Sequence, residues 1–197
     1  MSKGEQTREA ILQRAAPVFN QLGYSGASMS DIMRATGLEK GGIYNLFGSK
    51  EELALAAFDY AFGLVNERLR HALASKRNAI DRLCVMVETI GSQADNPPVS
   101  GGCPILNTAI DADDAHPALR DKARQAMDEW FDFIRRVGRR GSERGEVRPD
   151  VDPDDVATFL ISTLEGSIML SKLYGDPVHM RRAVAHLTDY LERHVRA

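Results

Sequence analysis

Residues 28–52 read SMSDIMRATGLEKGGIYNLFGSKEE and carry several helix boundaries in close succession. Ser28 and Ser49 each stand three positions before an acidic residue. This is the spacing of a capping box, in which both side chains bind free backbone N–H groups of a first helical turn. Gly37 and Gly48 each close a short apolar stretch, as glycine does where a helix ends. The stretch therefore predicts two short helices joined by a tight turn, followed by a long helix.

Apolar residues keep helical spacing on both sides of this stretch. A first helix of about 17 residues is expected to end at Gly23, and its inward face consists of Ile11, Leu12, Ala15, Val18, Phe19 and Leu22. Nowhere does a strand-like alternation extend over more than about four residues, so we expect an all-α protein of about nine helices. After the long helix, which runs to about residue 74, further helices are expected around 80–90, from Pro104, from Pro117 into 138–149, from Pro153, and from Pro177 almost to Ala197.

The composition indicates an ordinary soluble protein with an uneven charge. The 197 residues carry a net charge of −3, but residues 1–50 sum to +2 and the remainder to −5. No apolar run approaches the ~18 residues that span a bilayer, and the N-terminus has no signal-peptide core. We therefore expect a cytoplasmic protein without a membrane partner, divided into a helix-turn-helix domain at 1–50 and a ligand-binding and dimerisation domain at 51–197.

The second short helix has the residues that a DNA-reading helix needs. In a helix-turn-helix, the N-terminal part of this helix enters the major groove. Lys40 supplies a cation there, and Gly41 and Gly42 add no side-chain bulk. Tyr44 can donate a hydrogen bond to a phosphate, and Asn45 can bind base edges, adenine most specifically. Taken singly, the glycines can be a mere helix stop and Tyr44 a half-buried aromatic residue, but the ordered series favours DNA binding.

A longer ordered series resembles the DNA-binding domain of the TetR family of bacterial repressors. The resemblance covers about 50 residues without gaps. It implies an all-helical homodimer that binds double-stranded DNA at a palindromic operator, and a C-terminal domain whose small-molecule effector releases the DNA. The matching segments are 7–12, Phe19, 23–24, 28–32, 37–38, 40–44 and 47–53.

The expected DNA contacts follow from the helix-turn-helix together with this resemblance, which assigns Ser28 and Lys50 to phosphate. Leu46, where an aromatic residue or His is usual in the family, and Gly42, where Thr or Ala is more frequent, depart from the pattern and leave the base preference undetermined. Glu39, where Ser is commoner, also departs from it, and it either accepts a hydrogen bond from cytosine or faces solvent. The full set of expected contacts is Ser28, Arg34, Lys40, Gly41, Gly42, Tyr44, Asn45 and Lys50.

The rear part carries apolar, methionine and aromatic residues that suit either a plain core or a small-molecule site. Methionines adapt to varied shapes, and Trp130 offers a stacking face, so the effector is expected to be apolar, aromatic or electrophilic. Asn107 and Glu165 are the polar candidates. The candidate ligand-binding residues are Met86, Ile90, Cys103, Leu106, Asn107, Met127, Trp130, Phe131, Glu165 and Met169.

Cys103 has two interpretations. It follows two glycines at the expected start of a helix, where the helix dipole lowers a thiol pKa. The stretch from Gly102 to Asn107 also resembles a TetR subgroup that includes electrophile- and oxidant-sensing repressors. Cys103 is therefore either a sensor of that kind or a small buried core residue, whereas Cys84 on an apolar helix face is more simply core.

The last two helices present apolar stripes that either pair with those of a second chain, as the resemblance implies, or lie inside the chain. Gly63 and Gly166 interrupt helical patterns and predict close helix packing at those points. His116, near Asp111, allows a metal interpretation, but acids there more simply cap a helix. We therefore expect no metal, no cofactor and no enzyme activity; a helical protein that binds small molecules without specific DNA binding is the alternative.

Overall fold

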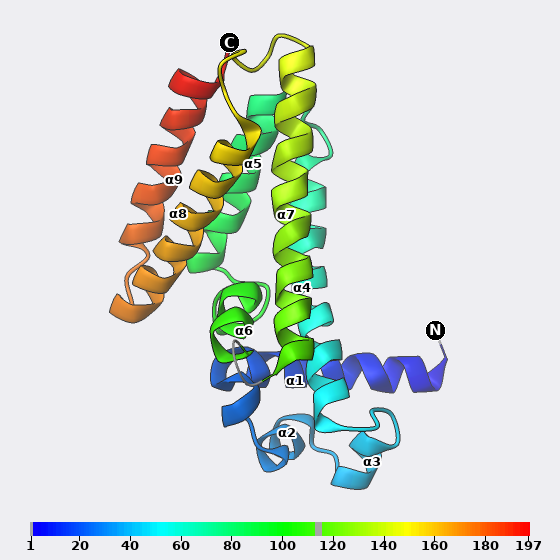
Figure 1. The fold of residues 1–197 in the computed structure, drawn as a ribbon. Helices are drawn as coiled ribbons and strands as arrows, with labels where there is room; N and C mark the ends of the chain where they lie inside the picture. The colour runs from blue at the N-terminus through cyan, green and yellow to red at the C-terminus, as the bar shows by residue number, and fades with distance from the viewer. Residues whose placement is uncertain (1, 113–115) are drawn as a thin grey trace. The chain divides into compact units, whose positions relative to one another are not determined.

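The computed structural model describes residues 2–112 and 116–197, and within these ranges it contains nine α-helices and no β-strand (Figure 1). This confirms the all-α prediction. A 3₁₀ turn at Ser92–Ala94 follows α5, and a π-helical turn at Leu191–Val195 follows α9. The helices are α1 (Lys3–Gly26), α2 (Met29–Thr36), α3 (Lys40–Tyr44), α4 (Lys50–Leu73), α5 (Ala79–Gly91), α6 (Pro104–Ala112), α7 (Pro117–Glu143), α8 (Pro153–Tyr174) and α9 (Val178–Tyr190).

The chain forms two compact units. Unit 1 consists of Met1–Leu64 and Pro98–Ala126, and unit 2 of Val65–Pro97 and Met127–Ala197. Helices α4 and α7 each begin in unit 1 and continue into unit 2. The functional domains expected at 1–50 and 51–197 are a different division, and they stay a prediction.

The first helix bends at Gly23, where the sequence predicted its end. Gly23 has φ 73° and ψ 170°, and one further turn continues to Gly26. On the far side of the bend, the backbone N–H of Tyr24 donates to the Asp111 carboxylate at 2.8 Å. Leu22, expected on the inward face, is 50% exposed, and the buried position at this end of α1 belongs to Asn20.

Asn20 is buried because it is part of a polar network with the start of α6. Its side-chain amide donates to the carbonyl oxygens of Ser100 and Gly102, both at 3.0 Å. The amide of Asn107 donates in return to the carbonyl and the side-chain oxygen of Asn20 at 3.0 and 2.9 Å. These bonds satisfy polar groups that would otherwise be costly to bury, and they join α1 to α6 within unit 1.

Unit 2 is built around α5, α8 and α9, which pack on one another (Figure 1). The Asp152 carboxylate caps α8 through the N–H of Asp154 at 2.8 Å, as the sequence predicted. Close helix approach occurs at Gly91 and Gly141, where an added Cβ would lie 2.4 Å from Val184 and 2.6 Å from Ala79, respectively. The same test finds nothing within 4 Å of Gly63 or Gly166, so the prediction of close packing within the chain was wrong at both positions.

Helix α8 is apolar over most of its length. By length and composition it is the one helix of the described residues that could cross a membrane, and half of its most apolar stretch is buried inside the protein. Its buried residues, including Val156, Leu160 and Leu164, form the core of unit 2, and the glutamate at 165 is also buried. This core therefore accounts for about half of the apolar stretch of α8.

Replacing Gly101 by Ala tests the junction of α1 with α6. Gly101 has φ 118°, and an added Cβ would lie 2.7 Å from the carbonyl oxygen of Asn20. We expect Gly101→Ala to lower the free energy of unfolding by at least about 1 kcal/mol in urea denaturation. Gly63→Ala is the matched control, because Gly63 lies inside a helix with open space around it, and it should raise stability by roughly 0.5–1 kcal/mol. Equal effects of both substitutions would contradict this account.

Candidate nucleic-acid interface

Helices α2 and α3 form the predicted helix-turn-helix. Ser28 caps α2 by accepting from the N–H of Asp31 at 3.2 Å, while the Asp31 carboxylate accepts from the N–H of Ser28 at 3.0 Å. Gly37 ends α2 in the left-handed conformation, with φ 72°. Ile43 in α3 and Phe47 beyond it are fully buried. Both predicted boundaries of α2 are therefore confirmed, and one face of α3 is fixed to the core of unit 1.

The other face of α3 is open. Lys40, Gly41, Gly42 and Asn45 are exposed, and Tyr44 is half-buried. The Lys40 Nζ lies 5.6 Å from the centroid of the Tyr44 ring, so the cation and the aromatic ring occupy the same face. An added Cβ at either glycine would meet nothing within 4 Å. The chain itself gives no steric reason for glycine at these positions, which leaves room for another molecule to approach the backbone.

Arg34 and Ser28 are tied together through Asp31. The Arg34 guanidinium forms an ion pair with the Asp31 carboxylate, and the Ser28 hydroxyl donates to the same carboxylate at 2.6 Å. The hydrogen bonds from Ser28, and next the charge of Arg34, lower the pKa of Asp31 below its usual value. Ser28 at the start of α2 and Arg34 near its end are both exposed. The guanidinium of Arg34 has further N–H donors for solvent, whereas the single hydroxyl proton of Ser28 is donated to Asp31.

Lys50 is engaged inside unit 1. Its Nζ donates to the carbonyl oxygen of Tyr24 at 2.6 Å and lies 4.3 Å from the centroid of the Tyr24 ring. The residue is half-buried. Lys50 therefore joins the start of α4 to the end of α1, and a phosphate contact at this position stays a prediction.

Two arginines of α1 were not among the predicted site residues. Arg14 donates to the carbonyl oxygen of Thr36 at 3.3 Å and so satisfies the last turn of α2. The Arg8 guanidinium lies 4.9 Å from the centroid of the Phe47 ring. Both contribute to the net charge of +2 of residues 1–50, and Arg8 also stands in the segment 7–12 that resembles the TetR family. The sequence places both arginines on the outer face of the first helix, but it does not show which residues they contact.

The candidate ligand-binding residues are divided between the units. Cys103, Leu106 and Asn107 belong to unit 1, and the other seven to unit 2. Asn107 uses its amide in the network with Asn20. It also lines a cavity of about 30 Å³ in unit 1, which has room for about one water molecule and none for an effector.

In unit 2 the candidates differ in their exposure. Met86, Ile90 and Trp130 are buried, and the indole N–H of Trp130 donates to the Asn66 side chain at 3.3 Å. Met127 and Phe131 are half-buried, and Glu165 is 7% exposed. Met169 is 49% exposed on α8. A surface position of this kind suits an interface between proteins better than an enclosed cavity.

Both cysteines are buried thiols. Cys103 is 1% exposed at the start of α6, where its carbonyl accepts from the N–H of Asn107 at 3.1 Å. Cys84 is 8% exposed, and burial, followed by the charge of Glu192, raises its pKa to about 11. Thiolates react and thiols do not, so Cys84 is unreactive near neutral pH.

His116 lies in an aromatic environment. Its ring meets the Tyr24 ring edge-on, with centroids 4.2 Å apart, and its Nε2 lies 3.3 Å from the Ser25 hydroxyl. Asp113 and Asp114, which the sequence placed nearby, lie outside the described residues. Within the part of the chain that is described, no three His, Cys, Asp or Glu residues are grouped as a metal site would require.

A capped α2, a short α3 with one open face, and a following helical body define a helix-turn-helix protein of the kind that binds DNA. Two family models match the chain: "Bacterial regulatory proteins, tetR family" over residues 11–57, and "Tetracyclin repressor-like, C-terminal domain" over residues 79–187. The chain belongs to the TetR family of bacterial transcriptional regulators.

Similar proteins cover nearly the whole chain. A TetR transcriptional regulator from Chloroflexus aurantiacus J-10-FL is 47% identical, with a TM-score of 0.95 over 100% of this chain and 99% of that one. The repressor DhaR from Mycobacterium sp. (strain GP1) is 26% identical over 84% of this chain and 82% of its own length. A cysteine mutant of the TetR-family regulator CifR, solved with 26-bp double-strand operator DNA, is 26% identical over 94% of this chain and 95% of that one, with a TM-score of 0.79.

Replacing Asp31 by Asn tests the cap that positions α2. The substitution removes the charge from the capping box and from the Arg34 pair, and we expect it to lower the free energy of unfolding at pH 7. Because the folded-state pKa is lowered, this stabilisation is present above the unfolded pKa near 3.8 and is lost as the pH falls through the folded value.

Urea denaturation of both proteins between pH 7 and pH 3 measures the difference. Glu9→Gln is the control, since Glu9 is an exposed acid of α1. A difference between wild type and Asp31→Asn that grew toward low pH would show that the carboxylate does not stabilise α2.

Proposed function

We propose that this regulator is a repressor that binds a palindromic operator as a homodimer and is released by a small effector. The observation that carries the proposal is the open face of α3, with Lys40, Tyr44 and Asn45 beside two glycines that no internal contact requires. A reading helix needs this combination, because its backbone must come close to the groove while its side chains reach phosphates and base edges.

Each exposed side chain of the interface has a role that its chemistry supports. Lys40 binds phosphate oxygens, with Arg34 as a further cation, and Ser28 binds one when its hydroxyl proton turns from Asp31 to the phosphate. Tyr44 donates its hydroxyl to a phosphate, and Asn45 hydrogen-bonds a base edge. Gly41 and Gly42 allow close approach. The CifR operator complex supports this assignment, because that protein has the same fold and was solved on DNA.

A dimer is supported by the outer face of α8. Phe159, Met169 and Leu173 are 43%, 49% and 71% exposed, and Gly166 lies among them at helical spacing. A solvent-exposed apolar stripe of this length marks a protein interface. Gly166 has open space where a Cβ would stand, which allows the α8 helix of a second chain to approach closely. The Phe159 ring meets the Tyr190 ring of α9 with centroids 4.8 Å apart, so the stripe extends over both last helices.

The effector is proposed to bind inside the helical body, where buried polar groups accompany apolar side chains. Gln93 is 4% exposed, and among the described residues its amide makes no hydrogen bond. A buried amide without a partner is costly unless a bound molecule or water satisfies it. Met86, Ile90 and Trp130 are buried in the same unit. An apolar or aromatic molecule with at least one polar group fits these residues, and Glu165 is its further polar candidate.

We assign Cys103 to the core rather than to electrophile sensing. Its thiol is 1% exposed, and a sensor thiol must be accessible to its reagent. Alkylation by iodoacetamide should therefore be much slower in the folded protein than in urea for both cysteines. Rapid modification of Cys103 in the folded protein would instead support the electrophile-sensing subgroup.

Release follows if the effector prefers a conformation that DNA disfavours. An effector with equal affinity for both states shifts nothing, so the coupling lies in differential contacts. Helix α4 begins directly after the helix-turn-helix and continues into unit 2, so it can carry a tilt to α3 without any other connection. We propose that this tilt changes the separation of the two reading helices of the dimer.

Replacing Lys40 by Gln tests the phosphate contact. In a dimer the substitution removes two contacts, so the slope of log K against log salt should become shallower by about 1.8, with weaker binding to every duplex sequence. The measurement is fluorescence anisotropy on the duplex that the wild-type protein prefers, between 50 and about 200 mM salt. Arg70→Gln, which removes an exposed cation of α4, should leave the slope unchanged. An unchanged slope in Lys40→Gln would remove Lys40 from the interface.

Replacing Leu173 by Glu tests the dimer. Burying two carboxylates without partners in a symmetric interface costs several kcal/mol, so dimerisation should weaken at least about a hundredfold in sedimentation velocity. Ile110→Glu is the matched control, since Ile110 is an equally exposed apolar residue of α6, at 69%. If the Ile110→Glu variant became monomeric while the Leu173→Glu variant stayed dimeric, the interface would lie elsewhere.

A further inference from the structure

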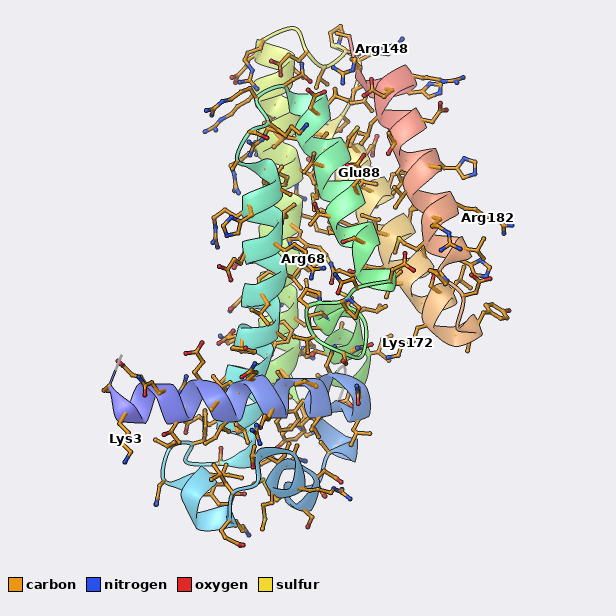
Figure 2. The ribbon with its side chains drawn as sticks, turned by 180° about the vertical axis from the view of Figure 1, so that it is seen from behind. Lys3, Arg68, Glu88, Arg148, Lys172 and Arg182 are labelled. Carbon is orange, nitrogen blue, oxygen red and sulfur yellow. The ribbon has the colours of Figure 1, made fainter. Side chains whose placement is uncertain are left out.

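Six cationic side chains surround a cleft of about 260 Å³ in unit 2, which we name the basic cleft. It lies where α4 ends, α5 begins and the second half of α7 passes, and nitrogen-bearing side chains gather at this end of the unit (Figure 2). Phe133 and Val137 supply its apolar part. The six cations are Lys76, Arg77, Arg82, Arg136, Arg140 and Arg144.

Most of this charge is not neutralised by the protein. Among the described residues, the side chains of Lys76, Arg77, Arg136 and Arg140 have no acidic partner within ion-pair distance and no hydrogen bond. Arg144 pairs with Glu146 at 3.2 Å.

The Glu146 carboxylate has a second partner besides Arg144. The sixth cation, Arg82, contacts neutral groups. The Glu146 carboxylate oxygen that meets Arg144 also accepts from the N–H of Ala79 at 2.7 Å. Arg82 donates to the carbonyl oxygen of Lys76 at 3.2 Å and lies over the Phe133 ring, 5.6 Å from its centroid. Among the described residues, a single ion pair therefore engages the six cations.

The register of α7 concentrates this charge. Arg136 and Arg140 stand four residues apart in α7, so they share one face of the helix, and like charges at this spacing destabilise a helix. Arg144 follows directly after the helix ends at Glu143 and lines the same cleft. The cations of the segment between α4 and α5 face the same cleft. An anion with several charges would remove this repulsion at once, whereas a single carboxylate would remove little of it.

We propose that the basic cleft binds a small molecule that carries two or more linked phosphate groups. Guanidinium groups match phosphate oxygens with paired, charge-assisted hydrogen bonds, and the cleft contains five of them. Its volume of about 260 Å³ lies just below the roughly 300–1,000 Å³ of small-ligand clefts. A concave cleft of this size encloses a short polyphosphate and is too small to enclose a nucleic-acid duplex. The site is separate in its residues from the proposed operator interface and effector site.

Calorimetric titration of the full chain with inorganic triphosphate at about 0.15 M salt tests the proposal. The test variant is Arg136→Gln with Arg140→Gln, and the control is Arg139→Gln, an exposed arginine of the same helix that does not line the cleft. Wild type and control should bind alike, and the double variant at least tenfold more weakly. Triphosphate should also raise the Tm of wild type and control but not that of the double variant, whose own Tm without ligand should not fall.

Other outcomes would overturn the proposal. Equal binding by all three proteins would show that the cleft is not the site, and loss of triphosphate binding in Lys40→Gln would place the anion on the helix-turn-helix. Displacement of triphosphate by random-sequence duplex, with duplex affinity falling in the double variant, would make a nucleic acid the occupant. Operator binding should be unchanged in the double variant. A failure of the basic cleft to bind triphosphate is therefore distinguishable from a failure of the proposed repressor function.

Discussion

The position of α3 depends on the burial of Ile43 and Phe47. Five residues are too few for a helix to be stable in water by itself, so the direction of this helix is set by the side chains it buries. Both residues are fully buried in one cluster with Ile32 of α2 and Leu53 of α4. The exposed face of Lys40 and Asn45 follows from this packing, because fixing one side of a short helix fixes the other.

The same cluster explains how the helix-turn-helix can respond to an effector that binds elsewhere in the chain. Leu53 lies one turn into α4, a helix that continues into unit 2. A movement of α4 that keeps Leu53 packed must move α3 with it, since well-packed interiors transmit displacement rather than absorb it. In the proposed repressor, the effector controls the separation of the two helix-turn-helix motifs of the dimer.

Local signals predicted both boundaries of α2, but the predicted end of the second short helix at Gly48 was wrong, since α3 ends at Tyr44. Contacts between distant residues could not be predicted. The Ser28 cap and the Gly37 stop depend on neighbours in sequence, and both were confirmed. Leu22 was placed inside wrongly, because Asn20 takes the buried position through bonds to residues 100–107 that periodicity cannot reveal. A glycine inside a helix indicates close packing, but the sequence does not show whether another helix lies beside it. The prediction of close packing at Gly63 was therefore wrong, and the close approach at Gly91 was not predicted. The internal bond of Lys50 to Tyr24 was hidden for the same reason.

Selection of duplexes from a random-sequence DNA pool measures whether a pair of α3 helices recognises an operator. The wild-type chain should enrich an inverted repeat, with half-site centres separated by about one or more helical turns, because two identical reading helices are related by two-fold symmetry. Enrichment of no sequence, or of one half-site without its inverted partner, would contradict the claim that paired α3 helices recognise an operator.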